Sequence, residues 1–181
     1  MKRLFCLMAA FVLVFSACCA AAEGVKFSTE YFSLQLPENW IIDTEDLESK
    51  EGEQSLGYFG GPADVDLVGG AFLVYYEDLK DFALWNASED EVKDYADALL
   101  EEFGDCNPVL VGTVTAGKIP LILIRGSDEE GEFLYADTMT NGYAIQFEFY
   151  VSDEEGEQMY PLTDEHIELV KTILATFQPA A

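Results

Sequence analysis

Four β-rich runs follow one another between residues 109 and 151, and they constrain the fold more than any other feature of the sequence. They cover residues 109–115, 119–124, 133–140 and 143–151, with short turn signals between them. Connections this short join antiparallel neighbours, because a parallel crossover needs a dozen or more residues. Asn141-Gly142, between the last two runs, suits a type I′ hairpin turn, in which both residues adopt a positive φ. The sequence therefore predicts an antiparallel meander.

One helix is predicted before this meander in the sequence and one after it. Ser88-Glu89-Asp90-Glu91 is a capping box, in which the serine oxygen and the Glu91 side chain each accept from a free backbone N–H. Gly104 is placed to end this helix, and Thr163 is placed to begin the second, with acidic residues in its first turn. The apolar stripes are Val92, Tyr95, Ala96, Leu99, Leu100 and Phe103 in the first helix, and Ile167, Val170, Ile173, Leu174 and Phe177 in the second.

Shorter strands are predicted before the first helix. Residues 32–36 alternate apolar and polar side chains until Pro37, and residues 40–42 and 56–59 form two more short β-rich runs. Residues 71–76 are apolar throughout, which is typical of a strand covered on both faces. The order is strands, a helix, an antiparallel meander and a helix. We therefore expect an α+β fold, with helices or loops packed on both faces of an antiparallel sheet.

The amino terminus has the three-part composition of a secretory signal. Lys2 and Arg3 precede an apolar stretch, and Ala20-Ala21-Ala22 offers a cleavage site. We expect residues 1–22 to be a signal peptide and residues 23–181 to form a single domain, released into the periplasm or the extracellular space. A second route stays open, because Phe15-Ser16-Ala17-Cys18 resembles a bacterial lipobox. Lipidation of Cys18 would instead hold the protein on a membrane as an anchored lipoprotein.

Charge limits the partners that such a chain can hold. The sequence has 35 acidic and 9 basic residues, for a formal net charge of -26. Nucleic acid is excluded as a partner, because its phosphates require a basic surface. A field of this sign attracts cationic proteins or divalent cations instead.

Catalytic motifs are sparse. His166 is the only histidine, which excludes a histidine-based metal cluster within one chain, and its place in the first turn of the last helix favours a structural role. The glycines of residues 57–61 are not followed by the Lys-Ser/Thr pair of a phosphate-binding loop. We therefore expect no enzymatic activity and no cofactor. Carboxylate pairs arise by chance in so acidic a chain, so a carboxylate-dependent hydrolase stays open as an alternative.

One acidic feature recurs. The hexapeptide Ser-Asp-Glu-Glu-Gly-Glu of residues 127–132 is repeated unchanged as residues 152–157. The two strands predicted between the copies are antiparallel neighbours, so the chain returns to the end of the sheet from which it started. Both copies should therefore lie near that end. Carboxylate oxygens are the ligands that Ca²⁺ prefers, although neither copy has the spacing of an EF-hand loop. The alternative is two ordinary solvated turns. The candidate ligands of a weak Ca²⁺ site are Asp128, Glu130, Asp153 and Glu155.

Two segments resemble a known family. Residues 32–40, Phe-Ser-Leu-Gln-Leu-Pro-Glu-Asn-Trp, are similar to the strand followed by Leu-Pro-x-x-Trp that begins the PsbP-like and DcrB-like proteins, and residues 170–177 resemble their last helix. The resemblance implies an α/β/α sandwich around an antiparallel sheet. It brings no catalytic residue set, because members of the family act as accessory or binding proteins.

We therefore expect an exported, non-enzymatic accessory or binding protein of the bacterial envelope. The alternatives are the hydrolase named above and a Ca²⁺-binding structural lipoprotein.

Overall fold

The computed structural model describes residues 24–45, 47, 49, 52–62, 66–152 and 159–180. The predicted signal peptide of residues 1–22, Cys18 within it, and the candidate ligands Asp153 and Glu155 lie outside these residues.

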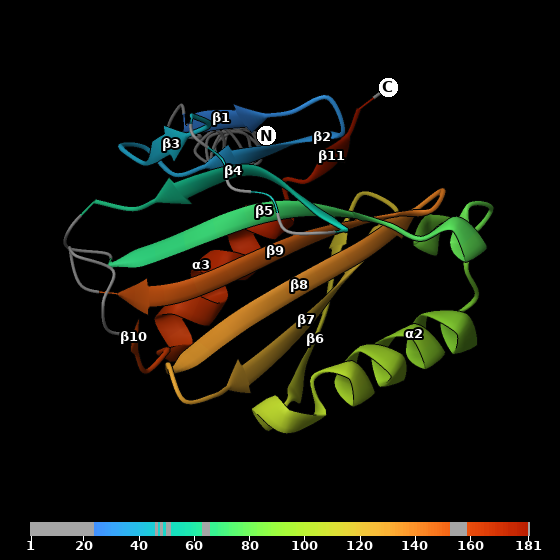
Figure 1. The fold of residues 1–181 in the computed structure, drawn as a ribbon. Helices are drawn as coiled ribbons and strands as arrows, with labels where there is room; N and C mark the ends of the chain where they lie inside the picture. The colour runs from blue at the N-terminus through green and yellow to red at the C-terminus, as the bar shows by residue number, and fades with distance from the viewer. Residues whose placement is uncertain are drawn as a thin grey trace, which may run out of the picture.

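Within the described residues, the strands form an eight-stranded and a three-stranded sheet, and every pairing is antiparallel (Figure 1). The large sheet has the order β3-β4-β5-β9-β8-β7-β6, with β10 paired to β9, and the small sheet has the order β1-β2-β11. The strands are β1 Val25–Ser28, β2 Phe32–Leu36, β3 Ile41–Asp43, β4 Glu53–Gly60, β5 Leu67–Tyr75, β6 Val109–Ala116, β7 Ile119–Ser127, β8 Glu132–Thr140, β9 Tyr143–Ser152, β10 Met159–Tyr160 and β11 Gln178–Pro179.

The predicted meander is confirmed as β6 to β9. Thr140 pairs with Tyr143 at the end of β8 and the start of β9. Asn141 and Gly142 between them have φ values of 50° and 86°, as the type I′ turn requires.

The helix α2 (Glu89–Glu102) begins with the predicted capping box. The backbone N–H of Glu91 donates to Ser88 Oγ over 3.3 Å, and the Ser88 N–H donates to Glu91 Oε2 over 2.8 Å. The end of the helix differs from the prediction. The chain continues past Gly104 in a 3₁₀ turn, η3 (Gly104–Cys106), and Asn107 then takes the left-handed conformation with φ 48°. Asparagine accepts this conformation at little cost, so it reverses the chain where the glycine was expected to do so.

The helix α3 (Asp164–Leu174) has Thr163 as its N-cap, as predicted. His166 takes part in its cap, because the His166 N–H donates to Thr163 Oγ1 over 3.3 Å and His166 Nδ1 accepts from the Thr163 N–H over 3.2 Å. The imidazole therefore has the structural role that its position indicated. Two further 3₁₀ turns, η1 (Glu77–Leu79) and η2 (Leu84–Asn86), lead into α2. No helix in the described part of the chain has the length and apolarity needed to cross a bilayer.

The two helices lie on opposite faces of the large sheet (Figure 1). The main core lies between that sheet, α3 and the small sheet, where the ring of Phe32 meets the ring of Phe147 at 5.1 Å between centroids. A smaller cluster lies under α2, where Leu99 packs with Ile122 and Ile124 of β7. The predicted α+β class with helices on both faces is thus confirmed, and the small sheet shares the layer of α3.

One face of β5 differs from the prediction. Ala71 and Leu73 are buried on the side of the main core, whereas Phe72 and Val74, on the α2 side, are only half-buried. The reason is that α2 packs over β7 and β8 and reaches β5 only at Val74, which joins a cluster with Val92 and Tyr95 of α2. Among the described residues, no helix lies over β4, the rest of β5 and the adjoining part of β9 (Figure 1). We call this surface, with Tyr58, Phe72, Glu148 and Tyr150, the open face.

Candidate functional site

A pocket of about 440 Å³ lies where the carboxyl end of α2 meets the open face. Strands β4, β5, β8 and β9 form its floor, and the last turn of α2 forms one wall. Its lining residues are Gly52, Glu53, Phe72, Val74, Tyr76, Glu102, Phe103, Tyr135, Gln146 and Glu148.

Strand register brings these residues together. Phe72 of β5 pairs with Gln146 of β9, and Glu148 of β9 pairs with Gly70 on one side and Tyr135 on the other. Side chains two positions apart on a strand share a face. This register therefore places the carboxylate of Glu148, the amide of Gln146 and the rings of Phe72 and Tyr135 next to one another.

Gly70 allows aromatic rings to lie over the sheet beside the pocket. A Cβ atom at this position would stand 2.8 Å from the ring of Phe72 and 3.2 Å from the ring of Tyr58. The two rings meet edge to face at 6.1 Å between centroids. Any side chain at position 70 would therefore displace the aromatic surface.

The pocket is electronegative. Glu53, Glu102 and Glu148 contribute carboxylates, and the carboxyl end of α2 adds the negative pole of a helix that has no basic residue in its last turn. The tyrosine in the wall stays neutral, because burial and then Glu102 and Asp137 raise the pKa of Tyr76 above its ordinary value. Carboxylates beside aromatic rings suit a cation, which can form charged hydrogen bonds and cation–π contacts in the same place.

A buried carboxyl lies beneath the pocket. Asp137 on β8 has no exposed surface, and its two oxygens accept from Tyr95 Oη of α2 over 2.6 Å and from Tyr135 Oη over 2.9 Å. Burial is the largest influence on this group and raises the pKa of Asp137 to about 6, against the hydrogen bonds from Tyr95, Tyr135 and Gln146, which lower it. Tyr135 and Gln146 also line the pocket, so they separate Asp137 from any ligand there.

Sequence reasoning missed Asp137, although the sequence holds a signal for it. Phe133, Tyr135, Asp137 and Met139 alternate along one face of a predicted strand. An aspartate in such a series indicates either an exposed position or a buried polar group with partners. Only the fold shows that α2 lies above it and supplies Tyr95 as one partner.

The predicted metal ligands are only partly described. Asp128 closes its own turn, since its Oδ1 accepts from the N–H of Glu130 over 2.8 Å and of Gly131 over 3.1 Å. In the same loop, Glu132 accepts from Arg125 over 2.7 Å and from the Leu162 N–H over 2.8 Å, which ties the β7–β8 turn to the segment before α3.

The two acidic copies begin at the same end of the large sheet, because Phe133 after the first copy pairs with Tyr150 shortly before the second. Asp153 and Glu155 lie outside the described residues, and Glu130 is exposed. Among the described residues, no group of three or more His, Cys, Asp or Glu side chains is arranged to hold a metal ion. The weak Ca²⁺ site stays a prediction.

Comparison with known proteins finds similarity in structure but not in sequence. No model of a known protein family matches the sequence, and no curated protein sequence matches it significantly. The solution structure of cyanobacterial PsbP (CyanoP) from Synechocystis sp. PCC 6803 is similar, with a TM-score of 0.48 and 15% identity over 90% of this chain and 96% of that one. A protein from Bacteroides thetaiotaomicron VPI-5482 is similar with a TM-score of 0.44 and 19% identity over 88% of this chain.

This chain spans 49% of the length of the Bacteroides protein. This similarity agrees with the PsbP-like resemblance of the sequence, and at these identities and TM-scores it carries no conclusion beyond that.

Proposed function

We propose that this chain is an exported, non-enzymatic accessory protein that holds a cationic partner, an arginine- or lysine-rich segment of another protein, on its open face. The observation that carries the proposal is the pocket at the end of α2, where three carboxylates stand among aromatic side chains. Export rests on the signal-like composition of residues 1–22, and the cationic character of the partner rests on the pocket and on the net charge.

The arrangement suits an arginine side chain. A guanidinium group can lie over the ring of Phe72 or Phe103 while it donates to Glu53, Glu102 or Glu148. Each exposed charge contact contributes about 0.2 to 1 kcal/mol, so a useful affinity requires several of them together. The net charge of -26 then increases the rate at which a basic segment finds this surface.

A carboxylate-dependent hydrolase is less well supported. A catalytic acid needs a raised pKa and must reach the substrate. Among the described residues, Asp137 is the carboxyl whose pKa is raised, and it has no exposed surface. The open face is therefore better suited to binding than to acid–base chemistry.

The test uses a short peptide with several arginines, and a second peptide with citrulline at the same positions. Citrulline keeps the shape of arginine and removes its charge. Isothermal titration calorimetry should show that the double variant Glu53→Gln/Glu102→Gln binds the arginine peptide about tenfold more weakly than the wild type, because two charge contacts are lost. Neither side chain makes a hydrogen bond within the described residues, so the substitutions should leave the fold intact.

The matched control is Glu38→Gln/Glu101→Gln, which changes the net charge equally at two exposed positions outside the pocket. It should change the affinity less than twofold. Equal losses in both variants, or equal binding of the citrulline peptide, would show that only the overall charge acts and that the pocket is not the site.

A further inference from the structure

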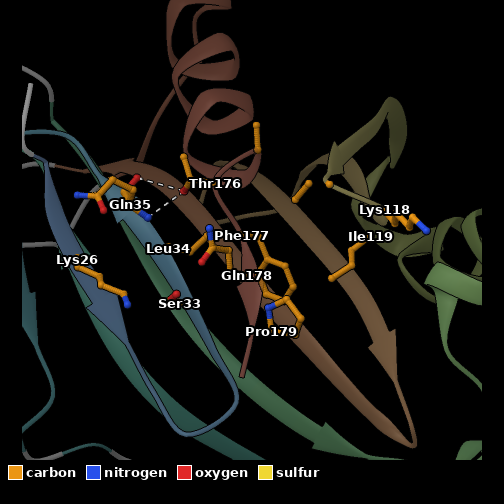
Figure 2. A pocket seen from close by; sticks show the side chains of 13 residues that line it. Lys26, Ser33, Leu34, Gln35, Lys118, Ile119, Thr176, Phe177, Gln178 and Pro179 are labelled. Atoms are coloured by element: carbon orange, nitrogen blue, oxygen red, sulfur yellow. Dashed lines mark hydrogen bonds between the residues drawn. The ribbon is translucent and has the colours of Figure 1, made fainter. Parts of the chain in front are cut away.

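A second pocket, of about 580 Å³, lies on the other side of the large sheet, between the small sheet and the β6–β7 turn (Figure 2). Three segments far apart in the sequence line it: Lys26 with residues 33–35, residues 116–119, and residues 175–179 just after α3. We call it the lysine pocket.

The charge of this pocket is opposite to that of the protein. Within the described residues, Lys93, Arg125 and Lys171 are ion-paired, whereas Lys26, Lys80 and Lys118 have no ion pair. Two of these three free lysines, Lys26 and Lys118, line the lysine pocket.

Among the described residues, none that lines the lysine pocket is acidic. With 35 acidic residues among 181, about two or three would be expected at thirteen positions taken at random. The pocket is therefore a local region of positive charge on a strongly acidic protein.

The interior of the lysine pocket combines apolar surface with free polar groups. Leu34, Ile119 and Phe177 are core side chains that reach the pocket with only 1%, 8% and 4% of their surface exposed, whereas Pro179 is exposed. Figure 2 shows Leu34, Phe177 and Pro179 between the two lysines. The side chains of Ser33, Gln35 and Gln178 make no hydrogen bond within the described residues and are available to a ligand.

The carboxyl end of α3 does not cancel this positive charge. Its last carbonyl groups already have partners, because the O atoms of Ile173 and Leu174 accept from the N–H groups of Thr176 and Phe177 over 3.0 Å each. The Thr176 hydroxyl adds a further bond of 2.6 Å to Ile173 O. The negative pole of α3 is therefore partly neutralised within its own last turn, and its effect does not extend beyond that turn.

From this combination we propose that the lysine pocket binds a small apolar carboxylate, a molecule with an apolar body and one or two carboxylate ends. The volume lies in the range of small-molecule sites, and together with the partly apolar lining it leaves room for a ligand larger than a bare inorganic anion. Figure 2 shows the Lys26 side chain reaching toward the pocket and the Lys118 ammonium group directed outward at the opposite rim. Lys26 therefore makes the main contact, and Lys118 contributes after a change of rotamer.

The probes are octanedioate, octanoate and 1,8-octanediol, which share an eight-carbon body and carry two, one and no charges. Titration of the ¹⁵N-labelled protein should show millimolar or tighter binding of both acids, with amide shifts at residues 33–35, 117–119 and 176–178. The diol should bind at least tenfold more weakly. Lys26→Met should weaken octanedioate binding about fivefold and Lys118→Met about twofold, because each removes an exposed charge contact.

The matched control is Lys80→Met. Lys80 is the third free lysine, it lies outside the pocket, and its loss changes the net charge equally. This variant should bind octanedioate as the wild type does, and thermal unfolding should give the same melting temperature for all three variants within about 3 °C.

Several results would overturn the proposal. Binding of the diol as tight as that of the acids would remove the role of charge. An equal loss in Lys80→Met would assign the effect to the net charge, and amide shifts confined to another surface, or no binding of either acid at millimolar concentration, would exclude the pocket as a site. None of these results bears on the cationic partner of the open face, because the two sites lie on opposite faces of the sheet.

Discussion

Replacing Asp137 by asparagine should make the protein more stable at neutral pH. Asp137 has no exposed surface, and its carboxyl is surrounded by the hydroxyl groups of Tyr95 and Tyr135 and the amide of Gln146. Burial raises the pKa of Asp137 from its ordinary value of 3.8 to about 6, so at pH 7.5 the folded protein carries a buried charge that it holds less favourably than water does.

The size of the effect follows from the pKa difference. The folded protein binds the Asp137 proton more tightly than the unfolded chain does, so this carboxyl contributes stability that is fully present below pH 3.8 and is lost as the pH rises through about 6. At 1.36 kcal/mol per pKa unit, the loss at pH 7.5 is about 3 kcal/mol. Asparagine is neutral at every pH and avoids this loss, although it gives up about 1 kcal/mol where its NH₂ group replaces an acceptor oxygen.

The net gain for Asp137→Asn is thus about 2 kcal/mol at pH 7.5, or a rise of about 4 to 8 °C in melting temperature for a domain of this size. Urea unfolding followed by circular dichroism, at constant ionic strength between pH 4 and 8, measures it directly. At pH 4 the wild type and the variant should differ by less than about 1 kcal/mol, because Asp137 is then neutral in the folded wild type.

The matched control is Asp94→Asn, which removes one charge from an exposed position on α2 and should change stability by less than about 0.5 kcal/mol at every pH. Protonation of the many surface carboxylates at low pH reduces their mutual repulsion, and this change in the free energy of unfolding is the same in the wild type and both variants. The reasoning is refuted if Asp137→Asn is less stable than the wild type at pH 7.5, or if its stability falls between pH 5 and 7.5 as steeply as that of the wild type.

Two further predictions concern stability. Thr138 is buried on β8, and its Oγ1 has no hydrogen-bond partner among the described residues, so Thr138→Val should raise the free energy of unfolding by about 1 kcal/mol; a loss in urea unfolding would show that the hydroxyl is satisfied. Gly142 has φ 86°, and a Cβ atom there would lie 2.9 Å from Lys80 Cα, so Gly142→Ala should cost at least about 1 kcal/mol in the same assay. An unchanged midpoint for Gly142→Ala would mean that the β8–β9 turn can adopt another conformation.

Much of the fold could be predicted from local sequence, because local chemistry determines the elements concerned. The capping box at Ser88, the N-cap at Thr163 and the Asn141-Gly142 turn each act within four residues, and the structure contains all three. The alternation of Phe32, Leu34 and Leu36 also gave the correct buried face of β2. These features do not depend on what packs against them.

The coverage of the open face could not be predicted in the same way. An apolar run such as residues 71–76 indicates that both sides of a strand avoid water, but it does not say what covers each side. In the structure, Phe72 packs edge to face against Tyr58 of the neighbouring strand, and Gly70 leaves room for both rings. Aromatic side chains can thus bury part of each other's surface on a region of the sheet that no helix of the described residues covers. The exposed part of the same rings is then available to the proposed partner.

The lysine pocket could not be predicted because net charge is an average over the chain. The strands and turns that carry Lys26 and Lys118 are brought together by the fold, and no sequence pattern links them. At physiological salt the field of exposed charges is screened over about 8 Å, so distant carboxylates affect the pocket much less than the two lysines at its rim do. In the two proposals, a chain with a formal charge of -26 therefore binds a cationic segment on one face of its sheet and an anion on the other, because the residues within a Debye length of each pocket determine which ligand it attracts.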